Sequence, residues 1–125
     1  MAKILVVDDS GMSRRTLRKI LEPAGYEIIE AEEGVVALEL YFLEKPNLVL
    51  LDLTMTGMYG MDVLKKLREM DPQARVIVAS ADIQSSTREM VDAGGASAFI
   101  NKPFTSEKVL SAVSMVLEGK IDATH

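Results

Sequence analysis

The 125-residue sequence has no cysteine, no tryptophan and a single histidine, His125. The absence of cysteine excludes a disulfide-stapled scaffold, a thiol catalyst and a zinc finger. One histidine leaves neither a histidine-rich metal site nor an internal catalytic triad. An apolar core must therefore hold the chain together, and a hydrophobic content of 48% in a chain of this length is sufficient for one domain.

Positive charge and long apolar runs are also scarce. There are 14 basic residues against 19 acidic ones, and no basic cluster of the kind that nucleic acid binding requires. The first residues lack the apolar length and cleavage site of a signal peptide, and no apolar run is long enough to span a membrane. We therefore expect a cytoplasmic protein that binds neither nucleic acid nor membranes.

Short apolar runs alternate with segments of helical periodicity along the chain. The five runs are Ile4–Val7, Ile28–Ile29, Leu48–Leu51, Arg75–Ala79 and Ala98–Ile100. Three of them are apolar on consecutive residues, which is typical of strands buried on both faces. The alternation predicts an α/β, three-layer, doubly wound domain over residues 1–119, with helices on both faces of a parallel sheet and residues 120–125 as a tail.

Turn and capping residues delimit the five helices that we expect between and after these runs. Gly25 ends the first helix, Pro46 follows the second, and Asp71 ends the third. Ser86 begins the fourth and Thr105 caps the fifth.

Polar residues stand at the carboxyl ends of four predicted strands. Asp8 and Asp9 follow the first strand, Asp52 the third, Ser80 the fourth and Lys102 the fifth. In such sheets ligands bind outside this edge, where the strand order reverses. Three neighbouring carboxylates stay ionised only beside compensating positive charge, which Mg2+ supplies. A carboxylate beside Mg2+ and an ammonium is a competent nucleophile towards a phosphoryl group, with the serine as a hydroxyl donor.

Each of these residues, taken alone, also has a purely structural explanation. Asp9 could cap the first helix and Asp52 could be a solvated strand-end residue. Ser80 could cap a loop, and Lys102 could be a surface charge, as most lysines are. Their joint placement at four strand ends favours a shared site.

The ordered set of motifs resembles the response-regulator receiver domains, and among them the free-standing, chemotaxis-type (CheY-like) members. The stretches that carry the resemblance are residues 4–10 (ILVVDDS), 31–34 (AEEG), 50–55 (LLDLTM), 80–81 (SA) and 99–104 (FINKPF). The resemblance covers residues 2 to about 118, and it implies a flavodoxin-like fold with five parallel strands in the order 2-1-3-4-5 and five helices.

The resemblance further implies how the chain handles a phosphoryl group. Asp52 matches the acceptor of a phosphoryl group from the phosphohistidine of a sensor histidine kinase or phosphotransfer protein, and Lys102 matches the phosphoryl-binding lysine. Mg2+ would be held by Asp9, Asp52 and the backbone carbonyl of Thr54, with Asp8 holding a metal-bound water.

Two further residues match the family's switch. Ser80 matches the switch hydroxyl and Phe99 the switch aromatic, whose movement alters the face built from the fourth helix, fifth strand and fifth helix. That face would bind a separate downstream protein. As an alternative, Phe99 is only a core aromatic. Two positions depart from the family pattern: Thr56 replaces the usual proline, and Tyr59 stands where an acidic residue is common.

The leading hypothesis is a single-domain response regulator of a two-component system, with chemotaxis as a candidate pathway. It would catalyse only its own phosphorylation and dephosphorylation, would be a monomer or weak dimer, and would dock its kinase around Met12, Arg14, Arg15 and Arg18 of the first helix. A phosphorelay intermediate and a non-phosphorylated scaffold remain open. Two other classes do not match the sequence. A haloacid dehalogenase-type phosphatase has an Asp-x-Asp pattern after its first strand, whereas Asp8 and Asp9 are adjacent. A flavodoxin has a Ser/Thr-rich phosphate loop after its first strand and aromatic residues against its flavin, whereas this chain has Asp-Asp-Ser-Gly-Met there and no tryptophan.

Overall fold

The computed structural model describes residues 2–53, 60–80 and 95–119, and it contains a five-stranded sheet. The strands are β1 (Lys3–Val7), β2 (Glu27–Ala31), β3 (Leu48–Asp52), β4 (Val76–Ser80) and β5 (Ala98–Asn101). All neighbouring strands are parallel, and their order is β2-β1-β3-β4-β5. The predicted fold class and strand order are therefore confirmed.

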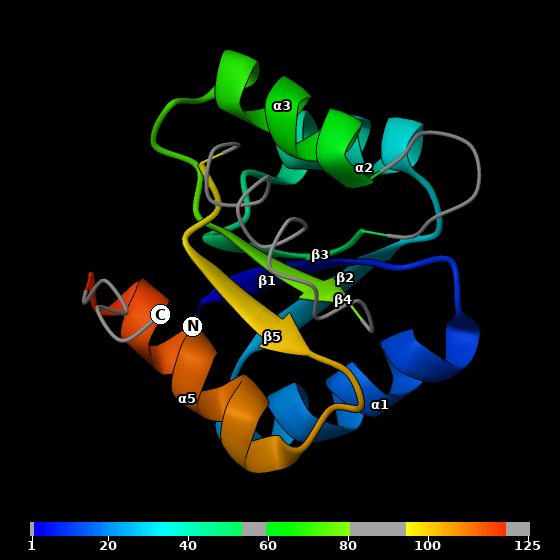
Figure 1. Cartoon of the computed structure of the whole chain (residues 1–125), viewed down its shortest axis with the longest axis vertical. Helices are drawn as coiled ribbons and strands as arrows, with labels where there is room; N and C mark the ends of the chain where they lie inside the picture. Colours follow the sequence, from blue (N-terminus) through cyan, green and yellow to red (C-terminus); the bar gives the residue numbers. More distant parts are fainter. Residues whose placement is uncertain (1, 54–59, 81–94, 120–125) are drawn as a thin grey trace.

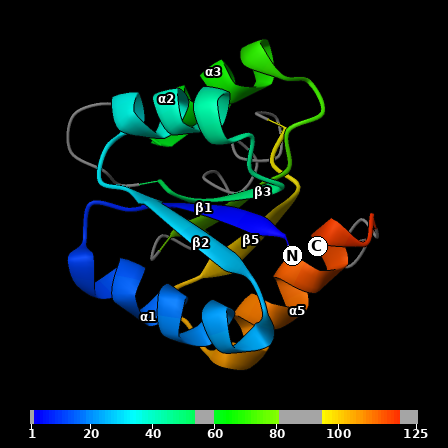
Figure 2. The same ribbon diagram turned by 180° about the vertical axis from the view of Figure 1, so that it is seen from behind.

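Helices cover both faces of the sheet, as Figures 1 and 2 show. The helices within the described ranges are α1 (Gly11–Leu21), α2 (Gly34–Glu44), α3 (Gly60–Met70) and α5 (Ser106–Leu117), and a 3-10 turn over Glu22–Ala24 follows α1. One layer holds α1 and α5, and the other holds α2 and α3. The predicted fourth helix and the tail over 120–125 lie outside the described residues. No helix in the described ranges is long and apolar enough to cross a membrane.

The helix ends mostly follow the predicted signals. Gly25 ends the 3-10 turn with a φ of 99°, a left-handed conformation that glycine adopts without strain. The Thr105 hydroxyl accepts a hydrogen bond from the Lys108 backbone N–H at 3.3 Å, so the predicted cap of α5 is confirmed. At α1 the cap is Ser10, whose hydroxyl accepts from the Ser13 backbone N–H at 3.2 Å. The alternative in which Asp9 caps this helix is wrong.

The central strands bury both of their faces. In β1, Leu5 and Val7 point into the core under α2 and α3, whereas Ile4 and Val6 point into the core over α1 and α5. The same alternation continues in β3 and β4, which are buried along their whole length. Consecutive apolar residues are needed for burial on both faces, which explains why the sequence shows runs there.

Strand β2 is longer than its apolar run suggested. The sequence predicted Ile28–Ile29, but five residues of β2 pair with β1, from Glu27 opposite Lys3 to Ala31 opposite Val7. Because β2 is an edge strand, part of its surface faces water and polar residues are tolerated there.

The start of α3 packs directly on the end of β3. The Gly60 backbone N–H donates to the Leu53 carbonyl at 3.2 Å. A Cβ at Gly60 would lie 2.5 Å from both the Asp52 carbonyl oxygen and the Leu53 Cα. Only glycine allows this approach, since the opposing atoms belong to the backbone.

We expect Gly60→Ala to lower the free energy of unfolding by about 1–3 kcal/mol, because the new methyl overlaps backbone that must shift. Urea denaturation measures this loss. Gly11→Ala is the matched control, since its Cβ would meet only Arg14 Nη2 at 3.6 Å, an ordinary contact. Equal stability of the two variants would contradict the packing described above.

Candidate functional site

The strand register brings the predicted site residues to one edge of the sheet. Asp8 follows β1, Asp52 ends β3, Ser80 ends β4 and Lys102 follows β5. The last paired rungs join Val7 to Leu51, Asp52 to Ala79 and Ser80 to Asn101. All of these strands are parallel, so their carboxyl ends meet at the edge where ligands bind in this class of fold.

Three carboxylates and one ammonium meet at this edge. Asp8, Asp9 and Asp52 each offer a carboxylate oxygen, and these oxygens all lie within 4.8 Å of one another. The Lys102 Nζ lies 3.2 Å from Asp8 Oδ2 and 3.5 Å from Asp52 Oδ1. Negative charge is therefore in excess, and oxygen donors at this spacing suit a hard divalent cation such as Mg2+.

Two of the three carboxylates are almost completely buried. Asp8 is 2% exposed and Asp52 is 3% exposed, whereas Asp9 lies on the surface. The buried Ser80 sits at the end of the neighbouring strand. The exposed Asp9 marks the side of the cluster that faces solvent.

Hydrogen bonds to the backbone and to the side chain of Asp8 hold the segment that follows β1. The Asp8 backbone N–H donates to the Ala31 carbonyl at 3.1 Å, and its Oδ1 accepts from the Ser10 backbone N–H at 2.9 Å. The second oxygen, Oδ2, faces Lys102. The carboxylate therefore has a defined orientation towards the site.

Lys102 is anchored through its backbone and its side chain. Its N–H donates to the Ser80 carbonyl at 2.9 Å, which extends the pairing of β4 with β5. Its Nζ lies 5.6 Å from the centre of the Phe104 ring, within range of a cation–π interaction. The following peptide bond, to Pro103, is cis.

An ion-pair network behind the site was not predicted from the sequence. Arg14 Nη1 donates to the Asp8 carbonyl at 2.6 Å, and Arg14 Nε donates to Glu30 Oε1 at 2.9 Å. The other carboxylate oxygen, Glu30 Oε2, accepts from Arg18 Nε at 2.9 Å. The network ties α1 and β2 to the backbone of the aspartate loop. The available signal was a glutamate after two isoleucines, with two arginines four residues apart on the preceding helix.

Opposing effects set the protonation of Glu30. Burial alone raises the pKa of this carboxyl, but the hydrogen bonds and charges of Arg18 and Arg14 outweigh burial and hold the pKa below its usual value. In return, the hydrogen bond to Glu30 raises the pKa of Arg18.

Phe99 pairs with Val78 of β4, two residues before the rung that joins Ser80 to Asn101. It is half-buried in β5 and packs against the core under α2 and α3. It also lines a cavity of about 330 Å³ between β5 and α5, whose other walls are Ile100, Asn101, Glu107, Lys108, Ser111, Ala112 and Met115. Its assignments as a core aromatic and as a switch residue are compatible with this position. Thr54, Thr56 and Tyr59 lie outside the described residues.

Comparison with known proteins agrees with this geometry. Residues 4–114 match the response regulator receiver domain family. The chain is 42% identical over 118 residues to chemotaxis protein CheY of Bacillus subtilis (strain 168), a match that covers 92% of this chain and 97% of that protein. It is 34% identical over 122 residues to sporulation initiation phosphotransferase F of the same organism, covering 94% and 95%.

A solved structure of a CheY-containing complex has the same fold as this chain. The chain superposes with a TM-score of 0.89 on a chain of the CheX–CheY–BeF3–Mg2+ complex from Borrelia burgdorferi, at 35% identity, covering 92% of this chain and 88% of that one. The protein belongs to the response regulator receiver domain family and is of the CheY-like type.

We expect Glu30→Gln to lower the free energy of unfolding by about 1–3 kcal/mol at neutral pH, because charge-assisted hydrogen bonds to two arginines are lost. The Glu30 pKa is lowered by folding, so its contribution is present above the unfolded value of 4.5 and disappears as the pH falls through the folded value. Urea denaturation of both proteins from pH 7 to about pH 3 should show the gap closing below pH 4.5.

Glu27→Gln on the same strand is the matched control. Its side chain is 57% exposed and 4.0 Å from Lys3, so its loss should change stability little. A Glu30→Gln effect that is small, or that does not depend on pH, would contradict the stabilising role of the network.

Proposed function

We propose that this receiver accepts a phosphoryl group on a carboxylate oxygen of Asp52 in a Mg2+-dependent reaction. The observation that carries the proposal is a carboxylate only 3% exposed, within 4.8 Å of two further carboxylates and 3.5 Å from an ammonium. The donor would be the phosphohistidine of a sensor histidine kinase or of a phosphotransfer protein.

The site residues have distinct parts in this reaction. An Asp52 oxygen attacks phosphorus, a phosphorus–oxygen bond forms, and the bond from phosphorus to the donor's imidazole nitrogen breaks, with the leaving imidazole taking a proton from solvent. The Lys102 ammonium lies close enough to balance charge on the incoming phosphoryl oxygens. The Ser80 hydroxyl, at the neighbouring strand end, would donate to one of those oxygens.

The carboxylate set fits Mg2+, which supplies charge neutralisation of the phosphoryl oxygens when bound. Asp9 and Asp52 would ligate it directly, together with the Thr54 carbonyl, and Asp8 would hold one of its waters. The orientation of Asp8, fixed by Ser10 and by Lys102, suits that role. The relative from Borrelia burgdorferi was solved with Mg2+ in its complex.

The output would be a change in affinity for a separate protein. A phosphoryl group adds nearly two negative charges and three acceptor oxygens, enough to bias two packings of similar free energy. The Phe99 ring has no hydroxyl, so its position would depend on packing alone. The β5–α5 cavity beside it, together with the predicted fourth helix, is the proposed contact surface. The proposal retains a cytoplasmic location, a role in chemotaxis signalling, and no catalysis beyond the chain's own phosphorylation and dephosphorylation.

A phosphorelay role is a second candidate, supported by the similarity to sporulation initiation phosphotransferase F. A relay intermediate passes its phosphoryl group on to a histidine of another protein, whereas a switch loses it to water. Incubation of the phosphorylated chain with histidine phosphotransfer proteins, followed by mass measurement of both partners, separates the two roles.

The decisive experiment is the intact mass of the chain after incubation with acetyl phosphate. We expect one labile phosphoryl group that requires Mg2+, is abolished by a chelator, and is absent from Asp52→Asn. Asp62→Asn, which changes an exposed aspartate in α3, is the matched control and should be phosphorylated like the parent.

Two results would contradict the proposal. Phosphorylation of Asp52→Asn at the parent rate would assign the acceptor to another residue. Absence of any adduct, both with acetyl phosphate and with a panel of phosphorylated histidine kinases, would favour the scaffold alternative.

A further inference from the structure

The outer surface of α2 is unusually apolar for a helix that faces water. Val35, Val36, Phe42 and Leu43 are 52%, 36%, 70% and 69% exposed. A surface helix normally turns a polar face to solvent. Its inner side already packs on the core through residues such as Ala37, so these four side chains are not needed to hold α2 on the sheet.

The four apolar side chains surround one carboxylate, that of Glu39. Val35 and Phe42 are seven residues apart, as are Val36 and Leu43, so each pair lies along the helix axis two turns apart. Glu39 is three or four residues from all four, the spacing of neighbours on a helix surface. Single exposed apolar residues are common. Four around one point form a contiguous surface, here called the α2 patch.

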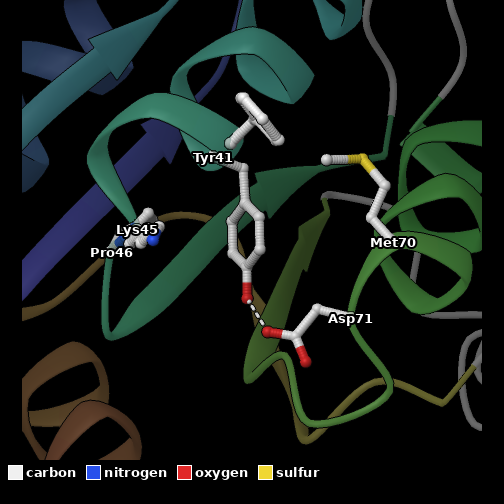
Figure 3. A pocket seen from close by; sticks show the side chains of 6 residues that line it. Tyr41, Lys45, Pro46, Met70 and Asp71 are labelled. Atoms are coloured by element: carbon white, nitrogen blue, oxygen red, sulfur yellow. Dashed lines mark hydrogen bonds between the residues drawn. The ribbon is translucent and has the colours of Figure 1, made fainter.

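A groove lies between the carboxyl-terminal ends of α2 and α3 (Figure 3). This cavity of about 520 Å³ is lined by Tyr41, Phe42, Lys45, Pro46, Met70 and Asp71. Phe42 belongs to both the patch and the groove, and Met70, on α3, is 44% exposed. The groove therefore extends the apolar surface from α2 to α3.

One wall of the groove is held in place by a hydrogen bond. The Tyr41 hydroxyl donates to Asp71 Oδ2 at 2.8 Å, and Figure 3 shows this contact. Burial, together with this bond, raises the pKa of Tyr41 to about 12, so the phenol stays neutral and the bond persists at ordinary pH. This hydrogen bond therefore joins the α2 wall of the groove to the end of α3.

The charge of Glu39 indicates whether the α2 patch binds a second copy of this chain or a different protein. Glu39 is the middle residue of α2, and no cation in the described ranges forms an ion pair with it. Two copies paired about a two-fold axis over the α2 patch would bring two Glu39 carboxylates together in apolar surroundings, where like charges repel strongly. A partner with a basic residue at that point removes the repulsion and pairs the carboxylate.

We propose that the α2 patch and its groove bind an amphipathic helix of another protein, in which a Lys or Arg is surrounded by aliphatic or aromatic residues. The basic side chain pairs with Glu39 inside an apolar ring that excludes water, and a neighbouring apolar side chain enters the groove beside Phe42 and Met70. The groove lies near the amino-terminal edge of the sheet, where Lys3 pairs with Glu44 at 3.0 Å. The inference does not depend on phosphorylation of Asp52.

Two synthetic helical peptides of about 18 residues test this proposal. They share leucines at helical spacing and differ only in a central Lys or Glu. Calorimetric titration of the full chain should show roughly tenfold tighter binding of the Lys peptide. Amide NMR shifts should change along α2 and at the end of α3, and not along α5.

Substitutions of exposed residues show which side chains bind the peptides, and they leave the core unchanged. Phe42→Ser should abolish binding, and Glu39→Lys should reverse the order of the two peptides. Met12→Ser is the matched control, because Met12 is 73% exposed on α1, on the other face of the sheet, and its loss should leave both affinities unchanged.

Three results would overturn the proposal. They are equal affinity for the two peptides, binding that persists in Phe42→Ser, and a stable dimer in sedimentation equilibrium that Phe42→Ser dissociates. The last would assign the α2 patch to a second copy of the chain.

Discussion

The ammonium of Lys102 lies between two carboxylates that the fold has removed from water, those of Asp8 and Asp52. Burial of a carboxylate is tolerated where charged partners and hydrogen bonds compensate for lost hydration. This cation comes from the end of β5, an edge strand, whereas the carboxylates come from the ends of β1 and β3. The ion pairs therefore form only when the sheet from β1 to β5 is complete, and the charge balance of the site depends on the whole strand order.

The segments that carry the two buried carboxylates are in turn held by neighbouring elements. Arg14 connects the Asp8 carbonyl to Glu30 of β2, so the orientation of the first loop depends on an ion pair between α1 and an edge strand. At β3 the support is steric, since the absence of a side chain at Gly60 lets α3 begin directly against the Asp52 carbonyl. The Asp8 segment is thus held by charge and the end of β3 by close packing, and each positions a carboxylate at the same edge.

The sequence predicted the parts of this structure that depend on local pattern. Consecutive apolar residues marked the buried strands, and the polar residues after them identified Asp8, Asp52 and Lys102 as neighbours, because parallel strands must end together. The arginine–glutamate network could not be predicted from the sequence. Its residues come together because α1 packs on β2, and no periodic pattern in the sequence marks that contact. The alternative that made Asp9 the cap of α1 was wrong: Asp9 and Ser10 are adjacent and both are good capping residues, so the backbone conformation is needed to identify Ser10 as the cap.

The two surfaces proposed above for protein partners lie on different elements. The β5–α5 cavity is next to Phe99, whereas the α2 patch belongs to the layer of α2 and α3. The groove at the end of α2 lies near the amino ends of the strands, and the carboxylates lie at their carboxyl ends. The groove and the carboxylates therefore lie at opposite ends of the strands. Phe99, beside the cavity, packs against the same core cluster as Ala37 and Tyr41 of α2, so packed side chains connect the two surfaces. On the function proposed above, phosphorylation of Asp52 would change what the β5–α5 face binds, and a partner on the α2 patch would occupy a different surface.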